Sequence, residues 1–263
     1  MDQLAGRSFR RILLIKPSSP GDILHALPVA RGLRAAFPES HLAWLVASSF
    51  ADLLEVEPSI DEVIRFDRKR YGRMWRSAAA FRAFVAFVRD LRARQFDLVV
   101  DLQGLFRSGF LSWVSRAGTR IGFRDAREAA WMFYTHRLPR RPHATHAADR
   151  NLAVLNHVGR PRIEPDLRPV FSAADAEAAR ALLTQTGIGP QDDYVVLVPS
   201  TRWETKRWPA ERFGTLAARL GCRPLACDGA ATMSIPSAGD RRGTMLRAVL
   251  VGGRDDTAAA EAG

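Results

Sequence analysis

The feature that most constrains this chain is the alternation of short apolar runs with amphipathic helical patterns over its first hundred or so residues. Short apolar runs are typical of buried strands, and residues with helical apolar spacing lie between them. We expect strands at 11–15, 42–46, 63–66 and 98–102, and helices at 23–36, 50–54 and 76–94. Strands that alternate with helices predict parallel βαβ units, and therefore a doubly wound α/β sheet.

The same alternation restarts near residue 190, which predicts a second half of related architecture. A strand at 194–198 and a helix at 210–220 follow a stretch that contains Pro161, Pro165 and Pro169. Proline continues neither a helix nor a central strand, so this stretch suits a connector. We expect a Rossmann-like N-terminal domain at 1–160, a linker with a connecting helix (173–185) at 161–190, and a second Rossmann-like domain at 191–263. A substrate cleft between two such halves would follow.

The second domain is expected to be truncated. Residues 222–244 are rich in Gly, Ala, Ser, Pro and Arg, and show no sustained helical or strand period. A strand pattern returns at 248–251, and the sequence stops about 70 residues after the alternation restarts. Domains typically run about 100–150 residues, so this half would lack most of its sheet.

The net charge of +11 is concentrated in one part of the chain. Residues 175–263 contain eleven basic and eleven acidic side chains, whereas residues 65–94 contain ten basic ones against only Asp67 and Asp90. Such an excess favours polyanionic partners, namely nucleic acid, phosphorylated lipid or an anionic membrane face. Nucleic acid is disfavoured, because the basic clusters lack regularly interleaved aromatic side chains and no helix-turn-helix or OB pattern is present.

Cysteine usage and hydropathy indicate a reducing compartment and no membrane span. Cys222 and Cys227 are not spaced as CxxC, and no second Cys/His pair completes a zinc site. No apolar stretch approaches the ~20 residues that cross a bilayer, and the apolar run at 12–15 is too short for a signal peptide. We therefore expect a cytoplasmic protein that is soluble or peripheral to a membrane and that binds no metal.

The loop at 16–22 is the most informative candidate site. It follows the first predicted strand and enters a helix, where the ligands of open α/β sheets bind. Ser18, Ser19 and Gly21 offer hydroxyls and backbone N–H groups to an anion at a helix N-terminus. The loop does not match the Walker pattern GxxxxGK[ST]. Asp22 is either a helix-capping charge, the commonest role of Asp at such a position, or a catalytic carboxylate.

Four motifs, in order, resemble those of the glycosyltransferase family that contains the lipopolysaccharide heptosyltransferases. The first is I-K-P-S-S-P-G-D-I-L-H-A-L-P at 15–28, and the second is D-L-Q-G-L-F-R-S at 101–108. The third is D-A-R-E at 125–128 with Phe133-Tyr134 and then His146-Ala147. The fourth is T-R at 201–202 with K-R-W-P at 206–209. The resemblance covers roughly residues 11–220 and points to the type I enzymes more than to type II.

The resemblance implies a GT-B fold, in which the N-terminal half binds the acceptor and the C-terminal half binds the nucleotide sugar. It implies that Asp22 is the general base and that Lys206 neutralises charge on the departing diphosphate. The implied donor contacts are Lys16, Ser18, Ser19, Gly21, Ser200, Thr201 and Asp256. The implied acceptor contacts are Arg68, Lys69, Arg70 and Arg73, expected on a loop after a strand, together with Gln103, Arg127 and His146.

The implied reaction is inverting transfer of heptose from ADP-heptose to the Kdo region of the lipopolysaccharide inner core, at the inner membrane and without a cofactor. Its partners would be this donor, an acidic glycolipid of the Kdo-lipid A type and an anionic membrane surface. The family's D-(S/T)-G-x-x-H segment, which binds the diphosphate, has no counterpart in the sequence. The alternative hypothesis is therefore an inactive chain, either an acceptor-binding pseudoenzyme or a fragment.

Overall fold

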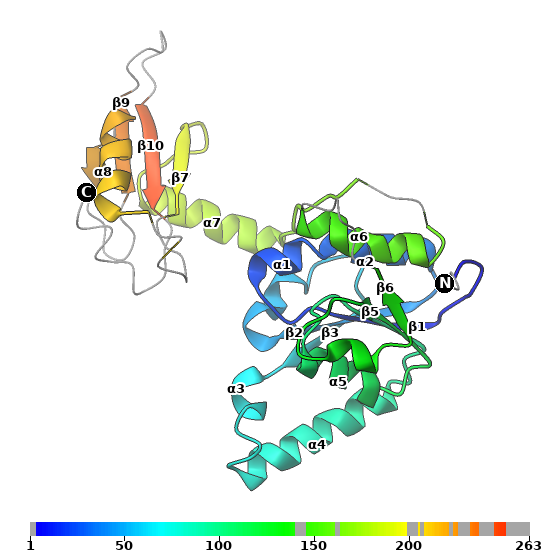
Figure 1. Cartoon of the computed structure of the whole chain (residues 1–263). Helices are drawn as coiled ribbons and strands as arrows, with labels where there is room; N and C mark the ends of the chain where they lie inside the picture. Colours follow the sequence, from blue (N-terminus) through cyan, green and yellow to red (C-terminus); the bar gives the residue numbers. More distant parts are fainter. Residues whose placement is uncertain are drawn as a thin grey trace. The chain divides into compact units, whose positions relative to one another are not determined.

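The structure is a computed structural model that describes residues 4–139, 146–160, 164–198, 205, 208–220, 223–225, 232–236 and 245–250. Two compact units, 1–171 and 172–263, make up the chain (Figure 1). The N-terminal unit contains the loop and the basic segment that the sequence singles out.

A six-stranded parallel sheet forms the centre of the N-terminal unit, in the order β3-β2-β1-β4-β5-β6. Its strands are β1 (Arg11–Ile15), β2 (His41–Ala47), β3 (Glu62–Phe66), β4 (Leu98–Asp101), β5 (Thr119–Phe123) and β6 (His136–Leu138). The chain runs outward from β1 to β3 and then returns to add β4 on the other side of β1. Ligands of such sheets bind where the order reverses, at the carboxyl ends of β1 and β4. The predicted doubly wound α/β fold is confirmed.

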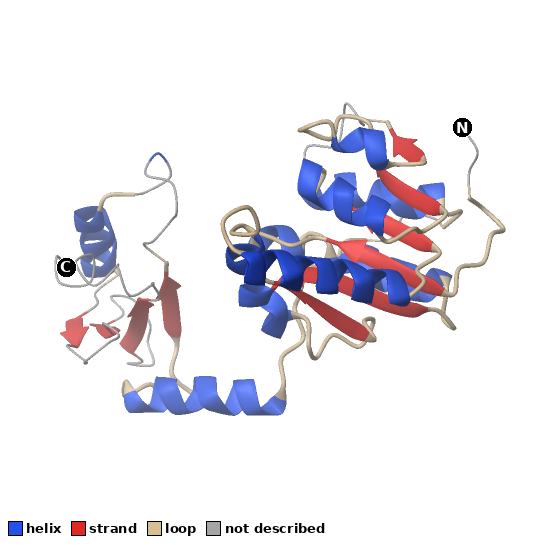
Figure 2. Cartoon of the chain, turned by 90° about the horizontal axis from the view of Figure 1, so that it is seen from below, coloured by secondary structure: helices blue, strands red, loops and turns tan. Residues whose placement is uncertain are grey.

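Both faces of the sheet are buried, which explains why its central strands are apolar almost throughout. Ile12 and Leu14 of β1 enter one core cluster, whereas Leu13 and Ile15 enter the other. Helices α2 and α6 cover the first face, and α4 and α5 cover the second (Figures 1 and 2). The helices of this unit are α1 (Pro20–Leu24), α2 (Leu27–Ala36), α3 (Arg68–Tyr71), α4 (Ala78–Ala93), α5 (Phe106–Val114) and α6 (Ala147–His157), with short 3₁₀ turns η1 (Ser48–Leu53) and η2 (Ala130–Phe133).

Two local predictions need correction. The single helix expected at 23–36 is divided into α1 and α2. Pro28 has no N–H to bond to the carbonyl of Leu24, and its ring disfavours a continuous helix there. The loop expected to carry Arg68, Lys69 and Arg70 is instead the short helix α3, which Asp67 caps by accepting a 2.9 Å hydrogen bond from the Arg70 N–H.

Other elements were not predicted from the sequence at all. The strands β5 and β6 and the helices α5 and α6 complete the N-terminal unit. Gly122 in β5 shows why their packing is specific, because a Cβ at this position would overlap the ring of Tyr134. Strand β5 contains Thr, Arg and Gly among its five residues. This pattern is too weak to predict a strand without the neighbouring strands of the sheet.

The C-terminal unit contains α7 (Ala173–Gln185), β7 (Tyr194–Leu197), α8 (Ala210–Arg219), β8 (Arg223–Leu225), β9 (Thr232–Pro236) and β10 (Met245–Leu250). The first three confirm the predicted helix, strand and helix. The four strands lie in the order β7-β10-β9-β8, with β10 parallel to β7 and β9 antiparallel to both its neighbours. Strands β8 and β9 lie within 222–244, where the sequence shows no sustained helical or strand period.

A buried carboxylate at the end of β4 bonds to a tyrosine that follows η2. Asp101, fully buried at the end of β4, accepts a 2.7 Å hydrogen bond from the hydroxyl of Tyr134. Its other oxygen accepts bonds of 2.8 and 3.2 Å from the backbone N–H groups of Gln103 and Gly104. Burial raises the pKa of Asp101 above its ordinary value, although these donors act against the rise.

Substitution of Tyr134 by Phe should destabilise the N-terminal unit by about 1–3 kcal/mol, because one oxygen of the buried carboxylate loses its donor. The loss should be larger at neutral than at acidic pH, since the hydroxyl favours the ionised form of Asp101. Urea denaturation across pH measures both effects. Tyr71→Phe is the control, since no described residue bonds to the Tyr71 hydroxyl. Equal losses in the two variants would contradict the prediction.

Candidate functional site

The loop at 16–22 leaves the carboxyl end of β1 and is attached to the neighbouring strand β2. The Lys16 N–H donates to the carbonyl of Leu45 at 3.2 Å, and the Lys16 carbonyl accepts from the indole N–H of Trp44, also at 3.2 Å. The Ala47 N–H then donates to the carbonyl of Pro17 at 3.0 Å. These bonds hold the first half of the loop beside the sheet, so the side chains that follow have a defined position.

A buried lysine lies beside Asp22. The Lys16 side chain, 10% exposed, places Nζ 4.0 Å from Oδ1 of Asp22 and donates to the carbonyl of Leu102 at 3.3 Å. Burial lowers the pKa of Lys16, while the charges of Asp22 and Asp101 oppose this effect. The ammonium therefore depends on these carboxylates for its charge, and its most direct partner is Asp22.

The two carboxylate oxygens of Asp22 have different surroundings. One suits the helix-capping role that the sequence left open, and the other suits the catalytic role. Oδ2 accepts hydrogen bonds from the N–H of Ser19 at 3.0 Å and from its hydroxyl at 2.9 Å, the arrangement of a helix capping box. Oδ1 faces Lys16, and the carboxylate is 44% exposed. Partial burial acts to raise the pKa of Asp22, but the Ser19 bonds and the charge of Lys16 outweigh it and lower the pKa. The group is therefore ionised at neutral pH and open to solvent.

The loop after β4 forms the second wall of the site. Gly104 has a φ of +64°, which glycine adopts without strain, and its carbonyl accepts a 2.9 Å bond from the Arg127 N–H. Arg127 and Arg150 both act to lower the pKa of Lys16, so their positive charges lie near the same loop. Arg127, a predicted site residue, thus contributes positive charge near the loop. Arg150, which was not predicted, does the same.

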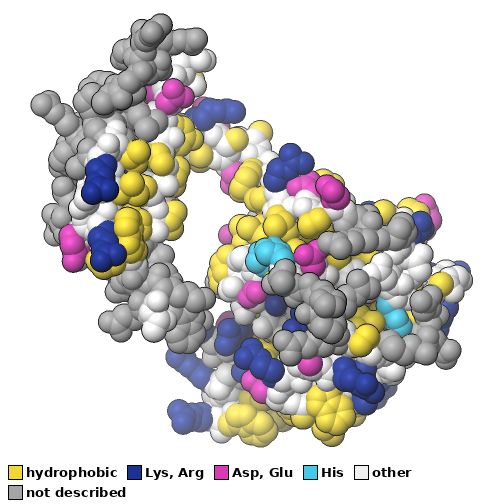
Figure 3. Space-filling model, turned by 45° about the horizontal axis from the view of Figure 1, so that its top comes forward, with side chains coloured by type: hydrophobic (Ala, Val, Ile, Leu, Met, Phe, Trp, Pro, Cys, Tyr) yellow, Lys and Arg dark blue, Asp and Glu magenta, His cyan; other side chains and the backbone are white. Residues whose placement is uncertain are grey.

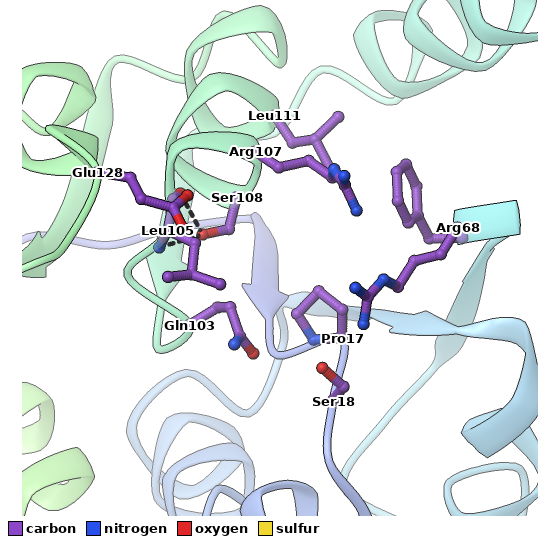
Figure 4. Close-up of a pocket in the computed structure, with 10 residues that line it drawn as sticks. Pro17, Ser18, Arg68, Gln103, Leu105, Arg107, Ser108, Leu111 and Glu128 are labelled. Atoms are coloured by element: carbon purple, nitrogen blue, oxygen red, sulfur yellow. Dashed lines mark hydrogen bonds between the residues drawn. The ribbon is translucent and has the colours of Figure 1, made fainter. Parts of the chain in front are cut away.

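A pocket of about 190 Å³ opens between these loops and the end of β3. Three predicted residues, Ser18, Arg68 and Gln103, line it. Figure 4 shows the side chains of Arg68 and Arg107 directed toward the space above Pro17 and Ser18. The other lining residues are Phe66, Leu105, Ser108, Leu111 and Glu128. Within the described ranges, Oε1 of Gln103 is buried and has no hydrogen-bond partner, so the pocket offers an acceptor as well as two guanidinium groups.

The other predicted basic residues lie on a second pocket. Lys69, Arg70 and Arg73 line a hollow of about 410 Å³ with Asp67, Ser77, Ala79 and Ala80, at the start of α4. Arg68 lines only the first of the two pockets. The structure therefore separates four residues that the sequence treated as one cluster. Basic side chains recur over the face of the N-terminal unit drawn in Figure 3.

His146 lies against His25, with ring centroids 4.7 Å apart. Its Nδ1 accepts a 3.3 Å hydrogen bond from the Ala148 N–H and so caps α6. His25 follows Asp22 by three residues, and its charge when protonated helps to lower the pKa of that carboxylate. The histidine pair is therefore a neighbour of the Asp22 loop, and the structural role of His146 is a helix cap.

Several predicted donor residues, namely Ser200, Thr201, Lys206 and Asp256, lie outside the described residues. Conversely, Arg107 and Glu128 line the pocket but were not singled out, although both lie inside motifs that the sequence shows, D-L-Q-G-L-F-R-S and D-A-R-E. Glu128 accepts a 3.1 Å bond from the Phe106 N–H at the start of α5. In the part of the chain that the structure describes, no group of three or more His, Cys, Asp or Glu side chains is arranged to hold a metal ion.

The fold and the site together define an α/β protein of the GT-B glycosyltransferase type. The chain belongs to glycosyltransferase family 9 (heptosyltransferase), whose sequence model matches residues 84–226. It is 30% identical, over 216 residues, to lipopolysaccharide heptosyltransferase 1 of Salmonella typhimurium, an alignment that covers 80% of this chain and 65% of that protein. The chain thus spans about two thirds of the length of this relative.

Solved structures agree with the assignment. The Escherichia coli heptosyltransferase WaaC with ADP-2-deoxy-2-fluoro heptose is 29% identical and has a TM-score of 0.63, over 80% of this chain and 65% of that one. A family 9 glycosyltransferase from Veillonella parvula has a TM-score of 0.70 over 84% of this chain and 61% of that one. At 24% identity, the second match supports the fold alone.

Loss of the Lys16 charge should raise the pKa of Asp22, because the ammonium favours the ionised carboxylate. Lys16→Met and Ser19→Ala should each shift this pKa upward, as measured by NMR titration of carboxyl carbons. Asp175, which Ser172 caps in the same way at the start of α7, is the internal control. Its pKa should not respond to either variant. An unchanged Asp22 pKa in Lys16→Met would show that the two groups are not coupled.

Proposed function

We propose that this protein is an inverting glycosyltransferase that moves heptose from ADP-heptose to the Kdo region of a phosphorylated glycolipid, as a heptosyltransferase of type I. The observation that carries the proposal is the carboxylate of Asp22, ionised and part-exposed at the carboxyl end of β1, beside a pocket lined by two arginines. Membership of family 9 and the likeness to WaaC with its ADP-sugar analogue support the donor class.

In this proposal Asp22 is the general base. Its Oδ1 accepts the proton of the acceptor hydroxyl while the oxygen forms a bond to the anomeric carbon and the bond to the diphosphate breaks. The ADP leaves with the bonding electron pair, and attack of the acceptor oxygen from the opposite face inverts the anomeric centre. The low pKa of Asp22 keeps the carboxylate in the form that accepts a proton. The nearby charge of Lys16 stabilises the ionised carboxylate, and Ser19 fixes its orientation.

The acceptor would lie in the pocket beside the loop. Arg68 and Arg107 offer forked donors that suit carboxylate and phosphate oxygens, and Gln103 offers an amide. Lys69, Arg70 and Arg73 extend the positive charge outward along α3 and the turn after it. Arg127 adds charge near Lys16, and His146 supports the loop through His25. A Kdo-bearing glycolipid, with its carboxylates and phosphates, matches this donor set.

The donor contacts are assigned from the resemblance of their motifs. We assign Lys206 to the neutralisation of charge on the departing diphosphate, with Ser200 and Thr201 bonding to its oxygens, on the resemblance of their motif. Ser18 and Gly21 would face the sugar from the other side, and Asp256 would contact the ribose. The reaction would take place in the cytoplasm, at the surface of the inner membrane where such a glycolipid is presented.

The direct test is release of ADP from ADP-heptose by the purified chain, with a deacylated, water-soluble form of the Kdo-lipid A acceptor. Transfer to the acceptor, seen by mass spectrometry, supports the proposal. Saturable binding of the acceptor without any ADP release would instead support the alternative, an acceptor-binding protein that lacks catalysis. Absence of both binding and release would overturn the proposal.

Asp22→Asn should reduce transfer by about 100- to 10,000-fold, the usual cost of removing a general base. The amide oxygen can still accept the bond from the Ser19 N–H, so the fold and the affinity for the soluble acceptor should change little. Asp175→Asn is a matched control, because it removes the same charge from the same kind of capping box on α7. Transfer rates within a few-fold of each other in the two variants would remove Asp22 from the mechanism.

Arg68→Gln should weaken binding of the soluble acceptor by about tenfold or more, because a charge-assisted pair to a carboxylate or phosphate is lost. The affinity for ADP should stay constant, and the salt dependence of acceptor binding should become weaker. Isothermal titration calorimetry measures both ligands. Arg124→Gln, also exposed on this unit but not on either pocket, is the control. Equal losses for ADP and acceptor would contradict the assignment of Arg68.

A further inference from the structure

The segment 68–82 forms a basic tip on the N-terminal unit. It contains α3, the turn at 72–77 and the start of α4. Figure 1 shows this segment at the margin of the unit, beyond the strands of the sheet. Six of its fifteen residues are Lys or Arg, and none is acidic. Asp67, immediately before the tip, already accepts the Arg70 N–H as the cap of α3.

Two aromatic side chains of the tip are directed into solvent. Trp75 is 83% exposed and Phe81 is 50% exposed. Neither has an aromatic or cation–π partner among the described residues. Their neighbours differ, because Tyr71, Phe84 and Phe87 pack against one another and against the core. Burial of the ring therefore does not explain the presence of Trp75 or Phe81.

The basic side chains next to these rings surround a hollow. Lys69, Arg70 and Arg73 line the pocket of about 410 Å³, whose other wall is the first turn of α4. No described carboxylate forms an ion pair with any of the three. Their charge is thus available to an external anion. Arg76 and Arg82, both exposed, flank the two aromatic residues along the chain.

We propose that this tip docks the protein onto a bilayer that contains anionic lipids. Trp75 and Phe81 enter the interfacial region, and Lys69, Arg70 and Arg73 hold lipid phosphates at the level of the headgroups. Trp and other aromatic rings favour this region, and arginine and lysine stems can lie along apolar surface while their charges reach phosphate. No helix in the described ranges has both the length and the apolar character to cross a membrane, so the contact is with one surface.

Charge complementarity selects this partner, and the arrangement of the rings favours lipid over nucleic acid. Proteins that bind single strands line a basic groove with stacking rings. Here three basic side chains line the pocket with Asp67, a serine and two alanines, whereas the rings lie outside it. The inference rests on the proposed function in one respect, because docking would bring the Asp22 site to a lipid-linked acceptor. Within the tip, Arg68 would then serve the acceptor pocket, and the outer basic residues would hold lipid phosphates next to it.

The experiment is cosedimentation of the full chain with vesicles that contain no acceptor, made either of phosphatidylcholine alone or of phosphatidylcholine with phosphatidylglycerol. Binding should require the anionic lipid and should fall as salt is added. Arg70→Gln should lower the partition coefficient about fivefold, since each cation near an anionic surface contributes about that factor. Trp75→Ala should lower it on the order of tenfold through lost burial of the ring.

Matched controls separate the tip from general charge and apolarity. Arg10→Gln removes an exposed charge at the amino end of β1, and Phe171→Ala removes a phenylalanine that is 66% exposed. Both should bind vesicles as the unmodified chain does, whereas Arg70→Gln and Phe81→Ala should not. Circular dichroism checks that each variant folds. The soluble-acceptor assay gives a separate readout, in which Trp75→Ala should keep full acceptor binding.

Three results would overturn the inference. The first is equal binding to neutral and anionic vesicles. The second is equal loss in the tip variants and their controls. The third is a different partner for the same residues, seen as tighter binding to an oligonucleotide than to vesicles, or as self-association that Trp75→Ala abolishes in sedimentation velocity. Failure of transfer with intact vesicle binding would count against the proposed function alone.

Discussion

The buried carboxylate of Asp101 is the interaction on which the geometry of this site depends. One oxygen holds the backbone of Gln103 and Gly104, and the other binds Tyr134, which lies 33 residues further along the chain. The conformation of the loop after β4 is therefore determined by hydrogen bonds to this buried carboxylate. Because a buried carboxylate without donors is strongly unfavourable, the loop, β5 and the η2 segment must be placed together.

A part-buried pair of opposite charges, Lys16 and Asp22, organises the loop at 16–22. Burial lowers the pKa of Lys16, and the charges of Asp22 and Asp101 oppose this effect. One oxygen of Asp22 pairs with the Lys16 ammonium, and the other belongs to the capping box at the start of α1. The capping role and the proposed catalytic role of this carboxylate are compatible, since each uses a different oxygen. A capping residue that is half exposed can take part in chemistry without loss of the helix start.

Basic residues in this protein are divided by position. Arg68 and Arg107 come from different elements, α3 and α5, and meet at one pocket. Lys69 and Arg70 line another pocket, because successive residues of a helix point to different sides, and Arg73 lines it from the turn after α3. The outer group lies beside exposed aromatic rings, and the inner group beside a buried amide. In our proposals, this division separates the surface that binds lipid from the pocket that binds the acceptor.

The sequence by itself determined the parallel α/β class, the central strands, the family and the loop that carries Asp22, because periodic apolar patterns and contiguous motifs are local signals. Only the tertiary structure decided which distant residues meet. Three features depend on strand order and helix packing: the Asp101–Tyr134 bond, the positions of Arg107 and Glu128 on the pocket, and the edge-to-face contact of His25 with His146. The division of the helix near Pro28 and the short helix at Arg68–Tyr71 were local features that the apolar pattern did not indicate. Apolar periodicity reports which face of an element is buried, and it carries no information about what that face is buried against.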